Sequence, residues 1–243
     1  MSSAPALPPL RRAFETAEQK RDYNRRLFST IADRYDLITG LLSYGQDRRW
    51  KARLVAMAGV SPDTHALDLA CGTGDIAFSV ASRGAEVVAL DLTPRMLQLA
   101  RAKRTVGDRV RFVAGDMTSL PFADHSFDIV TTGYGLRNVP LLAGALREIK
   151  RVLKPGGVML SLDFNRPDGV LLRTIYLAYL TVVGSLLGLA LHGNADTYRY
   201  IPESIRRYPG ARGVAEVAVA EGFSSCDAIA VFGGLMTIHR ATS

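Results

Sequence analysis

The residues best suited to bind a ligand lie in a short glycine turn, Gly72-Thr73-Gly74, which follows an apolar run at 66–70. Glycine permits a tight turn because it has no Cβ, and the apolar pattern after the turn predicts a helix over 75–83. A strand, a glycine turn and a helix N-terminus together present backbone N–H groups to a ligand. This stretch therefore predicts a site for a nucleotide-like cofactor.

A carboxylate is placed to bind the ribose of such a cofactor. Asp91 ends the next apolar run, nineteen residues after Gly72, and can accept hydrogen bonds from both ribose hydroxyls of NAD or of any adenosyl ligand. The spacing Gly72-x-Gly74-x-x-Ala77 also fits the dinucleotide fingerprint. These residues alone leave the choice of cofactor open.

A second carboxylate separates the two cofactors. Asp116 follows the third expected strand, 110–114, where it can accept a hydrogen bond from an adenine amino group while the Met117 N–H meets the ring. An NAD enzyme needs no acid at that strand end. Asp116 therefore favours S-adenosylmethionine, with a turn or helix-cap aspartate as the alternative.

Strand and helix patterns alternate from residue 66 onward. Strands are expected at 66–70, 86–90, 110–114, 127–132 and 157–163, and helices at 20–31, 47–57, 75–83, 93–104, 141–153 and 211–221. This alternation predicts a doubly wound parallel sheet with ligands at the carboxyl ends of its strands. Two final runs, near 223–231 and 232–239, have almost no connection and must pair antiparallel. We therefore expect an α/β Rossmann-like fold with a seven-stranded sheet, mostly parallel, that ends in an antiparallel hairpin.

Composition limits the classes of protein. The 243 residues carry 30 Lys and Arg against 23 Asp and Glu, a net charge of +7, with much of the excess in residues 11–53. A basic surface can attract nucleic acid or anionic lipid. The alternative is that these residues form an ordinary solvated helix face. The two cysteines exclude a disulfide framework, no segment has metal-ligand spacing, and a reducing cytoplasm is expected.

Four segments are expected along the chain. Residues 1–19 form a disordered tail without the features of a signal peptide, and 20–60 a helical extension. The cofactor-binding domain comprises 61–165 and 208–243, and 166–207 is an apolar helical cap inserted into it.

The insertion contains twenty-two consecutive residues without Asp, Glu, Lys or Arg, between Arg173 and Asp196. The run is long enough to span a bilayer, and Gly184 and Gly188 match a helix-pairing motif. A span would leave the C-terminal hairpin on the far side of the membrane and the sheet incomplete. We therefore interpret it as a cap of two short helices that receives a hydrophobic tail.

Several segments resemble the successive motifs of S-adenosylmethionine-dependent methyltransferases: Leu67–Gly74, Asp91, Gly115–Met117, Leu120–Asp124, Phe127–Asp128 and Arg151–Gly157. Others resemble more narrowly the quinone C-methyltransferases of ubiquinone and menaquinone synthesis: Tyr35-Asp36 to Trp50-Lys51, Gly135–Val139 and Asp196–Ile205. This narrower resemblance runs from about Phe28 to the C-terminus. The sequence departs from the family pattern at two positions. Thr39 stands where the family usually has Asn, and Gly133 stands where it often has Ser. At Gly133 we expect a direct backbone contact to replace the side-chain contact.

The resemblance implies two groups of site residues. S-adenosylmethionine is expected to contact Asp68, Gly72, Thr73, Gly74, Asp91, Leu92, Asp116, Met117 and Gly133. The acceptor, a prenylated quinol, is expected near Tyr134, Arg137, Asn138, Asp163 and His192. We also expect contact with the inner face of the cell membrane, no metal and no nucleic acid, and homodimer formation stays open.

The chemistry of a phenolic acceptor gives Arg137 a role. A phenol ionises near pH 10, so its reactive phenolate costs about 4 kcal/mol at pH 7, and a guanidinium beside the oxygen offsets part of that cost. Arginine stays protonated, so the proton goes to water, Asp163 or His192, and we expect water. The alternative for Arg137 is a structural ion pair with Asp128 or Glu148.

Other function classes also fit parts of the chain. They are a methyltransferase acting on another small hydrophobic acceptor, an RNA methyltransferase and an NAD oxidoreductase. The uncharged insertion and the Gly-Leu-Arg-Asn segment at 135–138 favour the quinol. Benzoquinol and naphthoquinol rings both stay open, as does the length of the tail.

Overall fold

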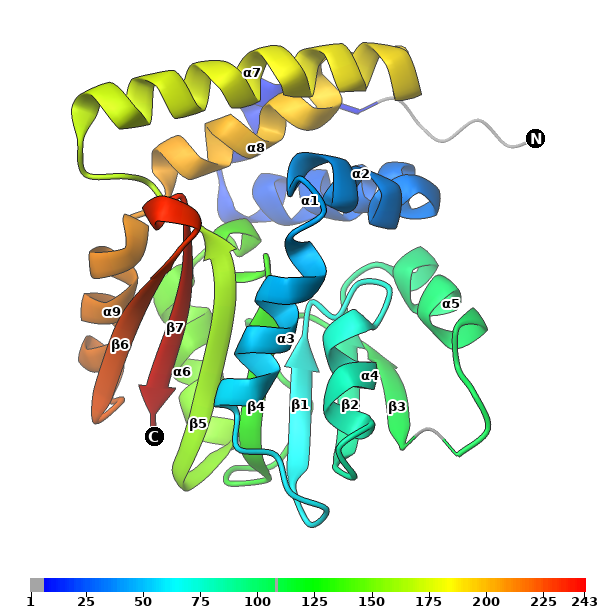
Figure 1. Cartoon of the computed structure of the whole chain (residues 1–243), viewed down its shortest axis with the longest axis vertical. Coiled ribbons are helices and arrows are strands. Elements are labelled where there is room, and N and C mark those ends of the chain that lie inside the picture. Colours follow the sequence, from blue (N-terminus) through cyan, green and yellow to red (C-terminus); the bar gives the residue numbers. More distant parts are fainter. Residues whose placement is uncertain (1–6, 108) are drawn as a thin grey trace.

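A seven-stranded sheet with the order β3-β2-β1-β4-β5-β7-β6 forms the centre of the molecule (Figure 1). The structure is a computed structural model that describes residues 7–107 and 109–243. Its strands are β1 (His65–Leu69), β2 (Glu86–Asp91), β3 (Val110–Ala114), β4 (Phe127–Gly133), β5 (Leu153–Phe164), β6 (Ser225–Val231) and β7 (Met236–Thr242). The first five are parallel, and β7 runs antiparallel to both β5 and β6. The predicted Rossmann-like fold, with its antiparallel C-terminal hairpin, is confirmed.

Helices cover both faces of this sheet and its carboxyl end. They are α1 (Ala17–Ile31), α2 (Tyr35–Leu42), α3 (Asp47–Met57), α4 (Asp75–Ala81), α5 (Pro94–Ala102), α6 (Leu142–Val152), α7 (Val170–His192), α8 (Asp196–Arg207) and α9 (Gly210–Ala220). Short 3₁₀ segments occur at Leu10–Phe14 (η1), Ala32–Arg34 (η2), Leu136–Asn138 (η3) and Phe232–Gly234 (η4). Figure 1 shows α7 and α8 at the end of the molecule toward which β1 points, with α1 and α2 between them and the sheet.

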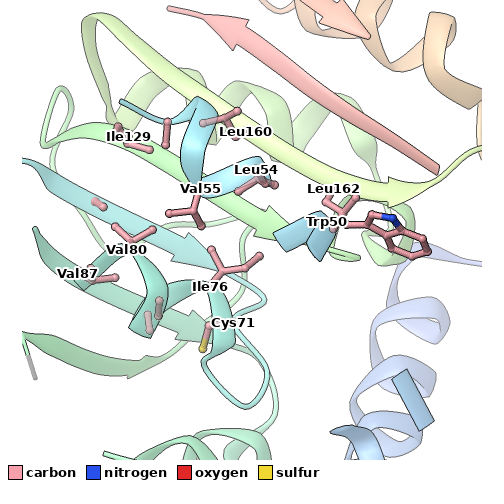
Figure 2. Packing of buried hydrophobic residues seen from close by; sticks show 14 of the residues in the cluster. Trp50, Leu54, Val55, Cys71, Ile76, Val80, Val87, Ile129, Leu160 and Leu162 are labelled. Atoms are coloured by element: carbon pink, nitrogen blue, oxygen red, sulfur yellow. The ribbon is translucent and has the colours of Figure 1, made fainter. Parts of the chain in front are cut away.

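Two apolar cores hold the helices against the sheet. On one face α3, α4 and α5 pack on the strands through residues that include Leu54, Ile76 and Leu97, and Figure 2 shows Trp50 and Leu54 of α3 beside Leu160 and Leu162 of β5. On the other face α6 and α9 bury side chains that include Leu146, Ile149 and Val214. Burying such side chains contributes roughly 1.5–3 kcal/mol each, so the sheet is a rigid platform for its strand ends.

The N-terminal segment is ordered from well before residue 20. Ala13 of η1 is buried, the Phe14 ring stacks on Tyr200 with 5.5 Å between centroids, and Thr16 caps α1 by accepting a hydrogen bond from the Gln19 N–H. The predicted disordered tail, 1–19, is therefore wrong for its described part, because this segment finds an aromatic partner in the insertion. Residues 1–6 lie outside the described residues.

The insertion is built from one long helix and one short helix, not from two short helices within the uncharged run. The glycines of α7 do not break it, because they lie where α8 approaches: a Cβ at Gly184 would lie 3.1 Å from the Tyr198 carbonyl oxygen, and one at Gly188 would collide with the Asn194 carbonyl. Thr181 and Ser185 donate back to carbonyls of their own helix. The helix ends at Gly193, whose φ is +65°.

A single asparagine joins the two ends of the insertion to the sheet. The Asn165 side chain accepts a hydrogen bond from the Ala211 N–H at 2.8 Å and donates to the Gly234 carbonyl, also at 2.8 Å. Its backbone N–H donates to the Leu235 carbonyl. The chain therefore leaves the sheet for α7 and returns from α8 to α9 at almost the same point.

The helix α7 is long and apolar enough to cross a membrane by length and composition. One side of it is packed inside the protein, where Tyr176, Leu177 and Leu180 meet Ile205 of α8. The strands that follow it, β6 and β7, complete the sheet next to β5. In this fold α7 lies across the protein rather than leading away from it.

Candidate active site

A narrow cavity, here called the cofactor cavity, opens at the carboxyl ends of β1, β2 and β4. It is lined by six of the residues expected to bind the cofactor, namely Gly72, Asp91, Leu92, Asp116, Met117 and Gly133. A smaller neighbouring space, here called the turn cavity, is lined by Asp68 and Thr73 together with Gly72 and Gly133. Gly74 lines neither; it precedes α4 with φ +89°, where a Cβ would meet the Phe78 ring.

Asp91 has the geometry expected of a ribose ligand. It ends β2, and its two oxygens accept hydrogen bonds from the Gly72 N–H at 2.9 Å and the Thr93 N–H at 2.7 Å. Burial raises the pKa of this carboxyl, and those backbone hydrogen bonds oppose the rise. A carboxylate can accept about four hydrogen bonds, so both oxygens keep capacity for ribose hydroxyls.

Asp116 follows β3, as predicted. Its Oδ1 accepts hydrogen bonds from the N–H of Thr118 at 2.9 Å and from the Thr118 hydroxyl at 2.7 Å. Both bonds go to one oxygen, which leaves Oδ2 to face the cavity for an adenine amino group. Met117 is buried beside it and supplies an apolar surface for the ring.

Asp68 is a buried acid next to the glycine turn. Its Oδ1 accepts a hydrogen bond from Thr131 at 2.8 Å, whereas Oδ2 has no hydrogen-bond partner among the described residues. Burial raises the pKa of Asp68 to about 7. A buried carboxylate oxygen without a donor suits the ammonium group of a methionine moiety.

This raised pKa makes cofactor affinity depend on pH. A ligand ammonium favours the carboxylate, so binding lowers the pKa of Asp68 from about 7, and protein that is protonated below that pH must release a proton to bind. We expect S-adenosylmethionine affinity to be full above about pH 7 and to weaken by up to tenfold per unit below it. Calorimetry at about pH 6 in buffers of different ionisation enthalpy should show release of nearly one proton. Asp68→Asn should abolish both effects; a flat profile in the unaltered protein would contradict this role for Asp68.

The N-terminal extension closes the cofactor cavity from above. Four side chains of α1 line the cavity, namely Arg21, Asn24, Arg25 and Phe28. The volume of about 90 Å³ is below the range of about 300–1,000 Å³ common for ligand sites. The side chains of α1 therefore form one wall of this narrow cavity.

The Tyr35-Asp36 pair fixes this extension to the glycine turn. Thr73 donates its hydroxyl to Asp36 at 2.6 Å, and Asp36 also pairs with Lys103 of the chain just after α5. The Tyr35 ring lies against Gly72, where an added Cβ would be 3.7 Å away. The pair begins α2, so these contacts hold the start of that helix against the glycine turn.

A second cavity of about 670 Å³ lies between α2, α7, α8 and the strand ends. Its lining is mainly apolar and aromatic, and Arg137 is the one charged side chain among the described residues that line it. Phe28, Tyr35, Tyr134 and Asn138 line both this apolar cavity and the cofactor cavity. A methyl group at that shared wall would face a molecule in the apolar cavity.

Arg137 is buried, with 5% of its surface exposed, and is fixed by several groups. Its Nε lies 3.2 Å from Asp163 Oδ1, its Nη1 bonds to the Ser204 hydroxyl of α8, and its guanidinium lies 5.1 Å from the centroid of the Phe164 ring. The alternative partners considered from the sequence are occupied elsewhere, since Asp128 pairs with Lys154 and Glu148 with Arg151. Arg137 therefore has an ion pair, with Asp163, and still reaches the apolar cavity.

Two more expected residues stand in the shared wall. Tyr134 donates its hydroxyl to Asp47 at 2.6 Å. Asn138 donates to the Tyr134 carbonyl at 2.7 Å, while its buried Oδ1 is without a partner in the part of the chain described. That oxygen can accept a hydrogen bond from a ligand hydroxyl.

His192 does not join this group. It lies at the C-terminal end of α7 and hydrogen-bonds the Tyr198 hydroxyl at 2.8 Å, and it is not among the residues lining the apolar cavity. Burial and the charge of Arg34 lower its pKa. His192 therefore lies behind Tyr198, which does line the apolar cavity, rather than in the cavity wall itself.

Sequence reasoning missed several residues that shape the site. Asp47 and Lys51 lie in α3 beneath Tyr134, and Ser204 holds Arg137 from α8. Lys20 donates to the carbonyls of Arg137 and Val139, and burial, followed by the charge of Arg137, lowers its pKa to about 8. Only Lys51 had a signal in the sequence, because the Trp50-Lys51 pair belongs to the family resemblance. The other residues reach the site through the fold, and no local sequence pattern identifies them.

The residues present fit S-adenosylmethionine: carboxylates follow β2 and β3, where ribose and adenine are expected, and the Asp68 oxygen without a partner among the described residues suits the ammonium. A strand order with β7 between β5 and β6, together with this site, defines an S-adenosylmethionine-dependent methyltransferase. Two solved structures of such enzymes share the fold. The one from Thermotoga maritima is 17% identical and covers 90% of this chain and 98% of that chain, with a TM-score of 0.64. The one from Aquifex aeolicus is 16% identical and covers 79% of this chain and 88% of that chain, with a TM-score of 0.58.

The chain belongs to the ubiE/COQ5 methyltransferase family, whose profile matches residues 15–243. It is 42% identical to the demethylmenaquinone methyltransferase of Thermus thermophilus, over 88% of this chain and 98% of that protein. It is 38% identical to the ubiquinone/menaquinone biosynthesis C-methyltransferase UbiE of Ectopseudomonas mendocina, over 91% of this chain and 89% of that protein. The protein is therefore an S-adenosylmethionine-dependent methyltransferase, and the NAD alternative is rejected.

Proposed function

We propose that this enzyme methylates a ring carbon of a prenylated, demethylated quinol, most closely demethylmenaquinol, with the demethylated precursor of ubiquinone as a second acceptor. The observation that carries this proposal is the apolar cavity with Arg137 in its wall, which shares Tyr134 and Asn138 with the cofactor cavity. An oily aromatic ring fits that lining, and a guanidinium beside its hydroxyl offsets part of the cost of the phenolate. The named relatives act in quinone synthesis, which supports the same acceptor.

In this proposal, separate residues of the chain bind the methyl donor and orient the acceptor. Asp91 and Asp116 bind the nucleoside and Asp68 the amino group, so that bound S-adenosylmethionine supplies a methyl group at the shared wall. Arg137 and Asn138 orient the ring hydroxyl, and the aromatic lining excludes water. Holding the two reacting carbons in line contributes several kcal/mol to catalysis.

A direct assay tests this function. The purified enzyme with methyl-deuterated S-adenosylmethionine should convert demethylmenaquinol to a product heavier by one labelled methyl group, detected by mass spectrometry. A cell without the gene should accumulate the quinone that is one methyl lighter. An unchanged quinone profile, together with no product in the assay, would reject the acceptor.

We also propose that the enzyme works in the cytoplasm, docked on the inner face of the cell membrane. A prenyl tail is stabilised in lipid by about 0.8 kcal/mol per CH₂, so the substrate must be drawn from a bilayer. The outer face of α7 exposes apolar side chains at helical spacing, namely Val182, Leu186 and Leu189, and α2 exposes Leu37 and Leu41.

Exposed aromatic residues mark the side of the apolar cavity that faces this surface. Tyr44 is 58% exposed and Phe232 45%, and both line the cavity. The hydroxyls of Tyr44 and Tyr179 bond to each other, and the two rings stack. Tyrosine rings with one apolar and one polar end favour the membrane interface, which supports this side as the entrance for the tail.

A charged substitution on α7 should weaken membrane docking. The double variant Val182→Asp, Leu186→Asp changes two exposed side chains that do not line the cavity, and we expect at least about tenfold weaker binding per residue. Sedimentation with anionic phospholipid vesicles measures this, and turnover of a tail-less quinol in solution should stay unchanged. Val106→Asp, an exposed residue between α5 and β3, is the control. Equal vesicle binding by the double variant and the control would contradict this surface.

A further inference from the structure

The proposed methylation requires a group that takes a hydroxyl proton from the quinol, and the inference below rests on that proposed function. Asp163 is engaged by three hydrogen bonds, from Arg137 Nε, the Arg137 N–H and the Phe164 N–H. Its side chain is fully buried and serves as the counter-charge of Arg137. His192 lies outside the cavity lining. Neither acid–base candidate from the sequence therefore lines the cavity in which the quinol is proposed to bind.

Tyr134 occupies the position where such a proton would be received. It lines the apolar cavity, the cofactor cavity and the turn cavity. Its hydroxyl donates to Asp47 Oδ1 at 2.6 Å, while the hydroxyl oxygen keeps its lone pairs for a second hydrogen bond. Asp47 itself is 6% exposed and begins α3, whose neighbours Gln46 and Trp50 line the apolar cavity.

The backbone holds this ring in place at a cost. Tyr134 has φ +61°, a left-handed conformation that is uncommon for residues other than glycine. Its N–H donates to the Leu162 carbonyl at 2.7 Å, and a Cβ on the next residue, Gly135, would collide with the Thr132 hydroxyl. Strain of this kind is concentrated at active sites, where a side chain must keep one position.

Tyr134 and Arg137 flank the same part of the cavity. The Phe164 ring is near both, 5.6 Å from the Tyr134 ring centroid and 5.1 Å from the Arg137 guanidinium carbon. All three side chains line the apolar cavity, so a quinol bound there has a cation and a tyrosine hydroxyl in the wall around it.

We propose that Tyr134 and Asp47 form a proton relay for the methyl acceptor. The quinol hydroxyl gives its proton to the Tyr134 oxygen as Tyr134 gives its own proton to the Asp47 carboxylate, which leaves a quinolate beside Arg137. The ring carbon of the quinolate takes the methyl group from the donor sulfur. The proton on that carbon then passes to water, while Asp47 returns a proton through Tyr134 to the ring oxygen. One proton is released per methyl group transferred, and Asp47 ends as it began. Tyr134 is the catalytic residue, and Asp47 acts through it.

Lys51 supplies the counter-charge for the relay and links it to solvent. Its Nζ lies 2.7 Å from Asp47 Oδ2 and 2.9 Å from Asp75 Oδ2, and the Asp75 side chain is 42% exposed. Burial alone would lower the pKa of Lys51, but the two carboxylates raise it above its usual range. Lys51 therefore stays a cation while Asp47 gains and loses its proton.

The test compares two substrates in two variants, Tyr134→Phe and Asp47→Asn. One substrate is the natural quinol and the other a halogenated quinol whose hydroxyl ionises near neutral pH. With the natural quinol we expect turnover to fall by about 10²–10³-fold, and with the acidic quinol by less than about fivefold, since that substrate needs no base. Turnover of the variants on the natural quinol should also rise about tenfold per pH unit above pH 7, as quinolate forms in solution.

Control variants and cofactor binding separate this role from a structural one. Tyr208→Phe removes a buried hydroxyl, Asp128→Asn removes a paired carboxylate, and neither residue lines the cavities described above; both should keep full turnover. S-adenosylmethionine affinity should stay within a few-fold in all four variants. Equal losses on both quinols, or no loss on either, would overturn the relay. Failure of the unaltered enzyme on both quinols would instead overturn the proposed function, and the relay with it.

Discussion

Arg137→Ala is expected to lower turnover by about 10²–10³-fold while S-adenosylmethionine affinity stays within a few-fold of normal. Removing one preorganised group that stabilises a developing oxyanion has a cost of this size. Arg137 lines the apolar cavity but not the cofactor cavity, so the loss should fall on the chemical step. Steady-state kinetics with saturating cofactor and calorimetry on the same sample measure the two effects.

The same substitution should also lower stability, because it leaves Asp163 buried without its cation. Breaking a buried pair in this way costs roughly 3–5 kcal/mol, so turnover and binding must be measured below the lowered unfolding temperature. Arg137→Lys keeps the positive charge but not the geometry of a guanidinium, and should recover part of the stability and little of the turnover. Arg147→Ala, which breaks an exposed pair with Glu221, is the matched control. A large loss of cofactor affinity in Arg137→Ala would refute the assigned role.

Asp91→Asn should weaken S-adenosylmethionine binding by about 100-fold or more. The amide would turn a donor toward the N–H of either Gly72 or Thr93, both of which now donate to this carboxylate. Loss of one charge-assisted ribose bond costs roughly 1.5–3 kcal/mol, and the misplaced donor adds to it. Turnover at saturating cofactor should fall by much less, because Asp91 does not line the apolar cavity.

A comparison with Asp116→Asn sharpens this result. Asp116 contacts Thr118 through one oxygen, so an asparagine can keep those bonds with its own carbonyl oxygen, and we expect a loss of only about tenfold. Titration calorimetry on both variants measures the two losses of S-adenosylmethionine affinity and shows which is larger. If Asp116→Asn proves the more damaging of the two, the order expected here is wrong and the adenine contact contributes more to affinity than the ribose contact.

The regular part of the fold could be predicted from the sequence because its signals are local. The strand 110–114 and the helix 47–57 have the bounds that were expected, since apolar runs and turn residues define their ends. The strand expected at 157–163 instead begins at Leu153, because the Pro-Gly segment that was taken as a turn is included in the strand. The tail and the cap were less well predicted because their order depends on distant partners, such as Phe14 on Tyr200 and Gly188 on Asn194.

In the candidate site, too, the residues with local sequence signals could be predicted and those that depend on distant partners could not. Residues at strand ends, such as Asp91 and Asp116, were found because the ends of parallel strands meet at one edge of a sheet. The alternative considered for Arg137 was an ion pair with Asp128 or Glu148, whereas its partner is Asp163, because a choice among carboxylates depends on three-dimensional position alone. Asp47 lies 87 residues from Tyr134 in the chain, and no spacing rule connects them.

The double attachment of Asn165 has a consequence for how this enzyme could acquire new acceptors. The inserted hairpin of α7 and α8 leaves and rejoins the sheet at one fastened point, so its length can change without moving the strands that hold the methyl donor. Recognition of the methyl donor and choice of acceptor are then separable within one polypeptide. Exchanging residues 166–207 between relatives should therefore transfer the part of the tail preference that α7 and α8 determine, while the cavity walls formed by α1, α2 and the strand ends stay unchanged.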